Sequence, residues 1–494
     1  MQPQNRKFYL LVAAFLLCAV LMGIFSAGRG KSSVEKWKEE MRAKGERFTI
    51  AELVPQRSGP ATNRLEELLR LSRGLSALGN SVNALEQMRY LSNGVAIAVW
   101  AGTNLGGTIG IGAGRRGGIP SSFAAYEWDS LAADLSAAEG TLFELHGFLR
   151  TPDRDTGWNY DPKTPMPRCF VEKRTIAQWL AAANTHHLHA HELNQAVTNL
   201  HAQFDLTAWH SEDFSLVGQM IRVALGGLAL HTTWATLQHP GLTDAQLAAL
   251  QARLQTNVLL PGVLRSFEVE RADMDQVFLS IRSGGETLKS AFGSGATGWD
   301  RVGEQAGAMG WRIFLSEADE LFYLRNMQGQ IDGLRLLLQQ RDWSGVQTNL
   351  AAVRAELLIF DTWRGNLLLV SSMAIPNLSK AMLNSVRHEA RRELTLAAVA
   401  LERHRRRHGH HPDTLSQLVP EFLPAMPVDW MDGKPLRYRL NPDGTYTLWS
   451  VGEDFKDDGG DGTEAKPPTV GSQPDIWNGR DALWPRLPAG TPVP

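Results

Sequence analysis

Apolar residues recur every three to four positions over most of the chain, which is the period of an amphipathic helix. Thr243 and Gln246 have the spacing of a capping box and predict a helix start just before an apolar stripe. Ser316 and Ser344 precede two similar stripes and are candidate N-caps. The pattern therefore predicts a mainly α-helical protein with a large helical body over residues 63–375.

Breaks in the helical pattern divide the rest of the chain. Glycine-rich stretches at 102–120 and 283–298 predict loops within the helical body. Strand patterns are expected only beyond the last helix, where "LRYRL" and "YTLWSV" flank the turn sequence "NPDG" and predict a β-hairpin. We therefore predict a small α+β minidomain over 376–462, followed by an irregular tail rich in proline and glycine over 463–494.

The N-terminal region has a different pattern. A short basic N-terminus over 1–7 precedes an uncharged apolar stretch over 8–27, and a charged stalk over 28–62 follows. A helix of that length, rising 1.5 Å per residue, spans a hydrocarbon core of about 30 Å. A cleaved signal peptide is the alternative, but Phe25 breaks the small-residue pattern of a cleavage site ending at Ala27. The sequence predicts an uncleaved, single-pass signal anchor, a transmembrane helix over 8–27.

The charges on either side of this segment bear on its orientation. Arg6 and Lys7 precede it, and a larger number of basic residues follows it, so the positive-inside rule alone favours a cytoplasmic body. A short basic start before an apolar run is nevertheless the usual export signal, and long domains translocate largely regardless of charge. We therefore predict a body on the exported, periplasmic side, with the lipid bilayer and other envelope proteins as partners.

Composition excludes several classes of protein. The chain is 43% hydrophobic and 21% charged with a net charge of −2, so it has no electrostatic footprint for nucleic acid. Its two cysteines are Cys18 and Cys169, and Cys18 lies inside the apolar stretch. This count excludes a disulfide framework, a cysteine-rich zinc site and an iron–sulfur cluster.

One histidine-rich stretch, "NTHHLHAHELN", is a candidate metal site. His187 and His191 are four residues apart, so on one helix they would lie on the same face and could chelate a metal. The stretch lacks the second histidine of an H-E-x-x-H motif, and the sequence defines no third ligand. His187 also continues an apolar stripe, so a partly buried histidine without a metal is the alternative interpretation.

The C-terminal part of the chain, from about 386 to 461, resembles the soluble end of the major pseudopilin of type II secretion. In that family a helix is followed by a glycine, a turn, a leucine-bearing segment, a "DPWGxPYxY" stretch, a hairpin and a calcium loop. The same order is found here in Gly409, His411 and Pro412, Leu415 and Leu418, "VDWMDGKPLRY" at 428–438, "YTLWSVG" and "EDFKDDGGD". The whole chain is similar to a group of membrane-anchored helical proteins of bacterial envelopes. The resemblance implies a pseudopilin-like minidomain with a calcium site.

Four aspartates, Asp454, Asp457, Asp458 and Asp461, crowd into this acidic loop and are interleaved with glycines. Their carboxylates repel each other unless a cation neutralises them, and glycines let a backbone wrap an ion. Calcium accepts irregular oxygen ligation more readily than magnesium. The loop is therefore a candidate calcium site with Asp454 and Asp461 as preferred ligands, and a solvated acidic turn is the alternative.

No catalytic residue is defined by these patterns. We expect a non-enzymatic, membrane-anchored envelope protein with a structural or interaction role, and calcium is the only cofactor predicted. One alternative is a periplasmic metal-dependent enzyme that uses the region of His187 and His191. Another is an accessory component of a secretion or pilus-like machine.

Overall fold

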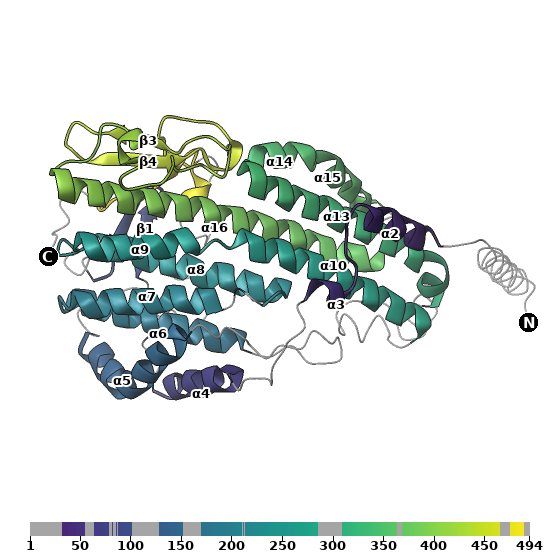
Figure 1. The fold of residues 1–494 in the computed structure, drawn as a ribbon, viewed down its shortest axis with the longest axis horizontal. Coiled ribbons are helices and arrows are strands. Elements are labelled where there is room, and N and C mark those ends of the chain that lie inside the picture. The colour runs from purple at the N-terminus through teal and green to yellow at the C-terminus, as the bar shows by residue number, and fades with distance from the viewer. Residues whose placement is uncertain are drawn as a thin grey trace, which may run out of the picture. The chain divides into compact units, whose positions relative to one another are not determined.

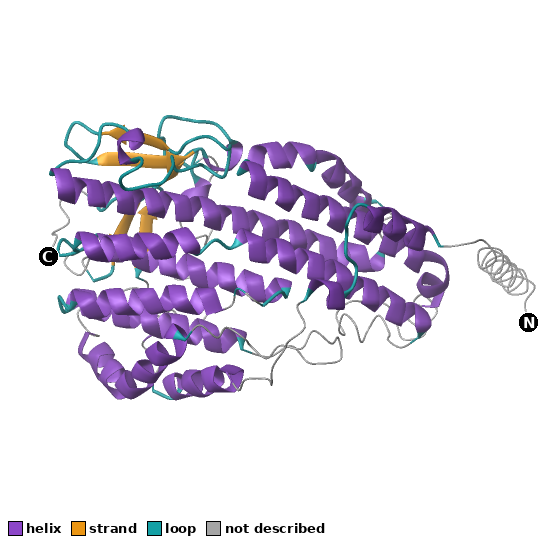
Figure 2. Cartoon of the chain, viewed as in Figure 1, coloured by secondary structure: helices purple, strands orange, loops and turns teal. Residues whose placement is uncertain are grey.

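The computed structural model describes residues 32–54, 64–78, 82, 85, 87–100, 128–151, 169–209, 211, 213–284, 309–362, 368–464 and 475–488. Within these ranges helices dominate, and the strands form two small antiparallel sheets (Figure 1, Figure 2). The prediction of a mainly α-helical fold is confirmed.

The helices vary widely in length, and α16 alone has 40 residues. In chain order they are α2 (Ser33–Ala43), α3 (Ile50–Leu53), α4 (Arg64–Ser76), α5 (Trp128–Arg150), α6 (Phe170–His189), α7 (Leu193–Trp209), α8 (Leu216–Leu237), α9 (Asp244–Thr256), α10 (Leu260–Ser283), α13 (Ser316–Gln340), α14 (Trp343–Asn349), α15 (Ala351–Leu357) and α16 (Leu369–His408). The strands are β1 (Met88–Ser92), β2 (Val95–Ala98), β3 (Arg437–Leu440), β4 (Tyr446–Ser450) and β5 (Ala482–Leu483).

The predicted capping box at the start of α9 is confirmed. The Thr243 hydroxyl accepts the backbone N–H of Gln246 at 3.3 Å, and the Gln246 side chain accepts the backbone N–H of Thr243 at 2.9 Å. Both orphan amides at this helix end are thereby satisfied. The local sequence pattern was sufficient here because every partner lies within four residues.

The two predicted serine caps differ from the structure. At α14 the cap is Asp342, whose carboxylate accepts the backbone N–H of Gly345 at 3.0 Å and the hydroxyl of Ser344 at 2.8 Å. Ser316 lies inside a continuing helix, because a π-helical turn over Trp311–Leu315 precedes it and its hydroxyl donates to a carbonyl of that turn. A carboxylate two residues earlier caps α14 in place of Ser344, and a preceding helical turn leaves no N-terminus for Ser316 to cap.

The described residues form two compact units. The first unit draws on residues within 1–56, 267–333 and 349–381, and the second unit on residues within 57–266, 334–348 and 382–494. Each unit is assembled from segments that are far apart in the sequence. The units therefore do not follow the boundaries expected at residues 62 and 375.

Residues of the expected stalk belong to the core of the first unit. Val34, Trp37 and Phe48 are buried, and the rings of Trp37 and Phe48 meet edge to face with centroids 5.7 Å apart. Lys38 is also buried, and its Nζ lies 2.5 Å from Oδ1 of Asp275. These contacts make α2 an amphipathic helix of the first unit, whereas its high charge alone suggested a solvated connector.

Asp319 of α13 fixes the start of α16 within the first unit. Its buried carboxylate accepts the backbone N–H groups of Val370 at 2.9 Å and Ser371 at 3.1 Å, and the indole N–H of Trp311 at 3.0 Å. A negative charge at a helix N-terminus is favoured by the orphan amides and by the helix dipole. A residue from another helix thus caps α16.

The second unit has its main apolar core among α4, α5, α6, α7 and α8. Buried residues from each helix meet there, among them Leu68, Leu131, Ile176, Leu206 and Leu225. Burying such side chains supplies roughly 1.5–3 kcal/mol each, before the entropy of ordering them is deducted. Both small sheets lie in the same unit.

A hairpin that the sequence pattern did not predict lies between α4 and α5 in the chain. Strands β1 and β2 pair antiparallel, with Met88 opposite Ala98 and a turn at Asn93 and Gly94. The expectation that strands occur only beyond the last helix is therefore wrong. Asn-Gly between two short alternating runs is a strong hairpin signal, and Gly94 adopts the positive φ, 75°, of a tight turn.

The hairpin predicted around "NPDG" is confirmed, and its sheet is larger than expected. Strands β3 and β4 pair antiparallel, and β5 from the tail adds to the other edge of β4. Within the tail, Ile476, Trp477 and Ala482 are buried. Residues 475–488 are thus part of the folded second unit, because apolar side chains interrupt a stretch that is otherwise rich in proline and glycine.

Several predicted segments lie outside the described residues. They include the anchor over 8–27, the glycine-rich stretch over 102–120 and most of the stretch over 283–298, of which α10 takes Ser283. Among the helices of the described ranges, none combines the length and the apolar composition that a membrane crossing requires.

Candidate functional site

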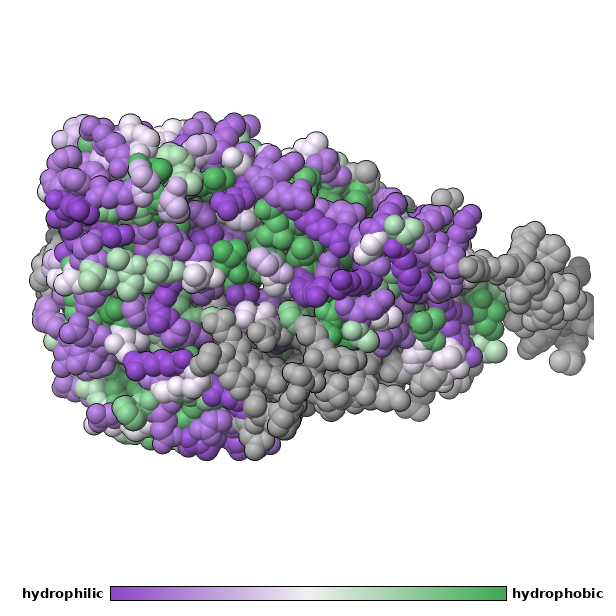
Figure 3. Space-filling view, in the orientation of Figure 1, coloured by the Kyte–Doolittle hydropathy of each residue, from purple (hydrophilic) through white to green (hydrophobic). Residues whose placement is uncertain are grey.

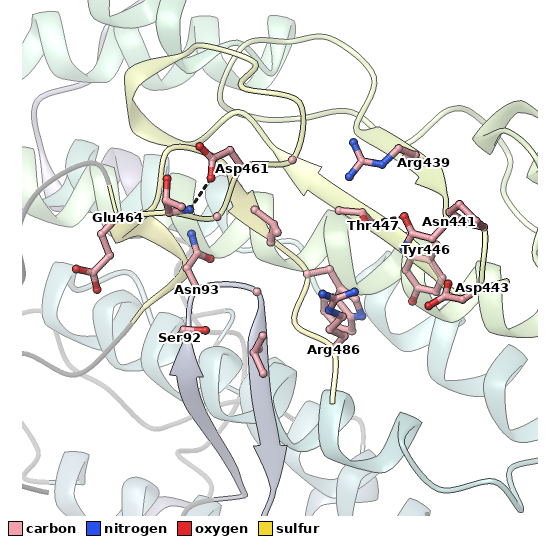
Figure 4. A pocket seen from close by; sticks show the side chains of 18 residues that line it. Ser92, Asn93, Arg439, Asn441, Asp443, Tyr446, Thr447, Asp461, Glu464 and Arg486 are labelled. Carbon is pink, nitrogen blue, oxygen red and sulfur yellow. Dashed lines mark hydrogen bonds between the residues drawn. The ribbon is translucent and has the colours of Figure 1, made fainter. Parts of the chain in front are cut away.

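A cleft of about 950 Å³ lies in the second unit, where the two hairpins approach the tail (Figure 4). Four segments that are distant in the sequence line it: 92–95 in the β1–β2 turn, 439–447 around the β3–β4 turn, 460–464 after the acidic loop, and 483–486 in the tail. Clefts of this size suit small molecules or a few residues of a peptide. We take this cleft as the candidate functional site.

Main-chain hydrogen bonds from the tail hold the walls of the cleft together. The backbone N–H of Trp484 donates to the carbonyl of Leu448 in β4 at 2.9 Å. Two residues later, the N–H of Arg486 donates to the carbonyl of Gly94 at 3.1 Å, and the carbonyl of Arg486 accepts the N–H of Ala96 at 3.0 Å. The tail therefore pairs with both sheets and joins the two hairpins.

Side chains reinforce the same junction. The amide of Asn93 donates to the carbonyl of Asp481 at 3.0 Å. The indole N–H of Trp234, a buried residue of α8, donates to the carbonyl of Pro485 at 2.8 Å. Because the tail is fixed to a helix, to a turn and to two sheets, the cleft is preformed rather than assembled by its ligand.

Charges of both signs surround the cleft. Figure 4 shows Arg486 between the two hairpins, with Asp443 and Tyr446 to one side and Asn93 to the other, whereas Glu464 points away. Hydrogen bonds from the hydroxyl and the backbone N–H of Thr445 lower the pKa of Asp443, and the charge of Arg486 lowers it further. Asp443 is thus held ionised beside a cation, which equips the cleft for polar and charge-based recognition.

The acidic loop beside the cleft is organised around a buried carboxylate, that of Asp481. This side chain accepts three loop amides, the N–H groups of Gly460 at 2.8 Å, Asp461 at 3.1 Å and Asp458 at 3.3 Å. Burial raises the pKa of Asp481 although the three donors oppose that rise. The loop backbone therefore turns its N–H groups inward onto an anion.

The four aspartates predicted as calcium ligands each have protein partners. Asp454 accepts the N–H of Lys456 at 3.1 Å, and Asp461 accepts the N–H of Thr463 at 2.9 Å. The carboxylate of Asp458 lies 3.8 Å from the Arg480 guanidinium, as does that of Asp461. These contacts tie each aspartate to its own surroundings.

Asp457 has the most extensive set of partners of the four. Its Oδ1 accepts the indole N–H of Trp449 at 3.0 Å and the N–H of Gly459 at 3.1 Å, and its Oδ2 lies 3.5 Å from the Arg437 guanidinium. Burial raises its pKa, but these donors outweigh burial and lower the pKa overall. Nowhere in the described ranges do three histidine, cysteine, aspartate or glutamate side chains converge as a metal site would require. Calcium binding by this loop stays a prediction.

The two candidate histidines do not share a helical face. Helix α6 ends at His189, and His191 lies in the following turn with a φ of 60°. His187 instead pairs with Glu192, whose carboxylate lies 2.7 Å from Nδ1, and the ring of His191 lies 5.9 Å from that of His239. His187 and His191 are therefore not on one face of a single helix, as the predicted chelation of a metal requires.

Sequence reasoning missed the residues that organise the minidomain. Asp429, like Asp481, is fully buried, and it accepts the N–H groups of Met431 at 3.0 Å and Val451 at 2.9 Å and the hydroxyl of Ser450 at 2.7 Å. Nothing in the local pattern distinguishes either aspartate from the exposed ones nearby. Only their position among distant backbone amides identifies them.

Comparisons of the chain with protein-family models, with curated proteins and with solved structures find no match. The interpretation of the cleft therefore depends on its own residues.

Proposed function

We propose that the protein is a non-enzymatic, membrane-anchored envelope protein that binds a partner through the cleft between its two hairpins. The observation that carries this proposal is the junction made by the tail. Residues 482–486 bond to both sheets, so the cleft is built before any ligand arrives. A preformed site avoids the entropic cost of ordering loops on binding, which favours recognition.

The chemistry of the cleft supports binding of a polar chain segment. Arg486 and Asp443 offer opposite charges, while Asn93 and Asn441 offer amides that both donate and accept hydrogen bonds. Such groups match the charged side chains and the backbone of an extended peptide. We therefore take the partner to be another protein of the envelope. The anchor over 8–27 would hold the cleft of this chain near the bilayer, where that partner lies.

Co-purification with matched variants tests this proposal. The full-length protein is isolated from gently solubilised membranes as the wild type, as Arg486→Glu and as Arg73→Glu. Arg486 lines the cleft, whereas Arg73 is an exposed arginine of α4 in the same unit. We expect one partner to be retained by the wild type and by Arg73→Glu and to be lost from Arg486→Glu.

The identity and the pattern of the recovered proteins decide between the alternatives. If an export complex is recovered with the wild type and Arg73→Glu but not with Arg486→Glu, the protein is an accessory component of a secretion or pilus-like machine. Identical recovery from all three proteins would rule out the cleft as the binding site. Stoichiometric zinc in the purified protein, lost from His187→Ala, would instead favour the metal-dependent enzyme.

A further inference from the structure

The first described residues of the chain are fixed to the start of α13 in the first unit. The N–H and the hydroxyl of Ser33 both donate to Oε1 of Glu317, at 2.8 and 2.7 Å. Ser32 caps α2 by accepting the N–H of Glu35. The chain that arrives from the apolar stretch over 8–27 therefore joins the first unit at one defined place, the first turn of α13.

An exposed apolar surface lies in the two helical turns before that place. Met309, Ile313 and Phe314 expose 64%, 51% and 40% of their surface, although each is large and hydrophobic. Ile313 and Phe314 precede Glu317 by four and three residues in a continuous helical stretch. Ile313 and Phe314 therefore lie within about one helical turn of Glu317, the residue that binds the start of α2.

Ile313 and Phe314 belong to a π-helical turn over Trp311–Leu315. Trp311 points inward, where its indole donates to Asp319 and its ring stacks on Phe278 with centroids 6.1 Å apart. Within the same turn Ile313 and Phe314 are exposed while Trp311 is buried. π turns of this kind occur frequently at functional sites.

Basic residues accompany the exposed apolar ones. Arg312 is exposed between Trp311 and Ile313, and Lys36 is exposed on α2. Arg29 and Lys31 precede α2 in the sequence. Large apolar side chains mixed with lysine and arginine are typical of a surface that rests on anionic lipid. The face visible in Figure 3 is predominantly polar, with apolar residues in scattered patches.

We propose that the surface formed by Met309, Arg312, Ile313 and Phe314, termed the membrane-facing turn, rests in the headgroup layer of the bilayer that holds the anchor. This inference depends on the proposed anchoring through residues 8–27. Ser33 follows Ala27 by six residues, which reach at most about 20 Å when fully extended. The headgroup layer is therefore within reach of the membrane-facing turn.

Photo-crosslinking of the full-length protein tests the inference. p-Benzoylphenylalanine is placed at Phe314 or, as a matched control, at Phe143, and each protein is reconstituted in vesicles of phosphatidylethanolamine and phosphatidylglycerol. Phe143 lies on α5 in the second unit and is 81% exposed, so exposure alone would favour labelling there. We expect roughly tenfold more lipid adduct at position 314 than at position 143, because only an interfacial side chain contacts acyl chains.

Each other outcome has a defined meaning. Equal lipid labelling at the two positions, in protein that floats with the vesicles, would overturn the membrane-facing turn and leave the anchor in place. An adduct at position 314 with residues 285–308 of the same chain, or with a second copy, would overturn it by identifying a different occupant. Protein that fails to float with the vesicles would refute the anchor itself, and with it both proposals.

Discussion

Gly226 of α8 lies directly against the imidazole of His388 in α16. A Cβ added at Gly226 would be 2.6 Å from Cε1 of His388 and 3.1 Å from Nε2. His388 is buried, so it has little space into which it can move. Because Gly226 has no side chain, α8 and α16 can pack closely at this point of the second unit.

Alanine substitutions at two adjacent glycines test this contact. We expect Gly226→Ala to destabilise the protein by roughly 1–3 kcal/mol, because overpacking displaces a buried ring. Gly227→Ala is the control, since a Cβ there has no atom within 4 Å. It should stabilise α8 by up to about 1 kcal/mol through helix propensity. Thermal midpoints of the full-length proteins measure both effects, and equal shifts at both positions would contradict the packing.

Acid should destabilise the second unit through His388. Burial lowers the pKa of His388 to about 4, and nearby arginines, Arg391 and Arg392, add to that effect. An unfolded histidine has a pKa of about 6.5, so between the two values only the unfolded chain binds the proton. Stability should therefore fall as the pH is lowered through this window, by at most about 3 kcal/mol from this residue.

Urea unfolding between pH 7 and pH 4 measures this dependence. The curve for His388→Gln should decline less steeply than that of the wild type, because the amide does not titrate. His410→Gln, at an exposed histidine, is the control and should keep the slope of the wild type. A His388→Gln curve parallel to the wild-type curve would show that the acid sensitivity arises elsewhere.

Asp481 should matter more to the acidic loop than any of the four aspartates within it. Asp481→Asn removes the charge that accepts three loop amides and leaves one oxygen to serve them, so we expect a loss of roughly 1–3 kcal/mol. Hydrogen exchange at Gly460 and Asp461 should accelerate in this variant. Asp454→Asn is the control, because its side chain accepts one local amide. Unchanged hydrogen-exchange rates at Gly460 and Asp461 would refute the role of Asp481.

Calcium titration tests the sequence-based proposal for the same loop. If calcium binds with a dissociation constant of roughly 0.1 mM, about 1 mM calcium stabilises the folded protein by about 1.4 kcal/mol. The thermal midpoint of the full-length protein should then rise, magnesium should have a smaller effect, and Asp454→Ala should abolish the rise. A midpoint that calcium leaves unchanged would show that the loop is a turn organised by Asp481 alone.

The hairpins β1–β2 and β3–β4 show which features a local sequence pattern can predict. Both have a turn sequence between alternating runs, at 441–444 and at Asn93 and Gly94, and both fold as hairpins. Each was in principle predictable, since hairpin register depends on a few adjacent residues. Their joining through Trp484 and Arg486 was not predictable, because the partners are separated by almost the whole second unit and backbone hydrogen bonds carry no sequence signature.

The sequence by itself determined that the chain is mainly helical, where α9 begins, and that a hairpin lies near the C-terminal end. These features follow from periodicity and from contacts within about four residues, which a sequence displays directly. Only the tertiary structure decided that the Asp481 carboxylate accepts the amides of the acidic loop and that His191 lies beyond the end of the helix that holds His187. It also decided that the tail completes the cleft. Those outcomes depend on burial and on hydrogen bonds between distant segments. A buried polar group must find a partner, and only the complete fold determines which groups are buried and which partners lie near them.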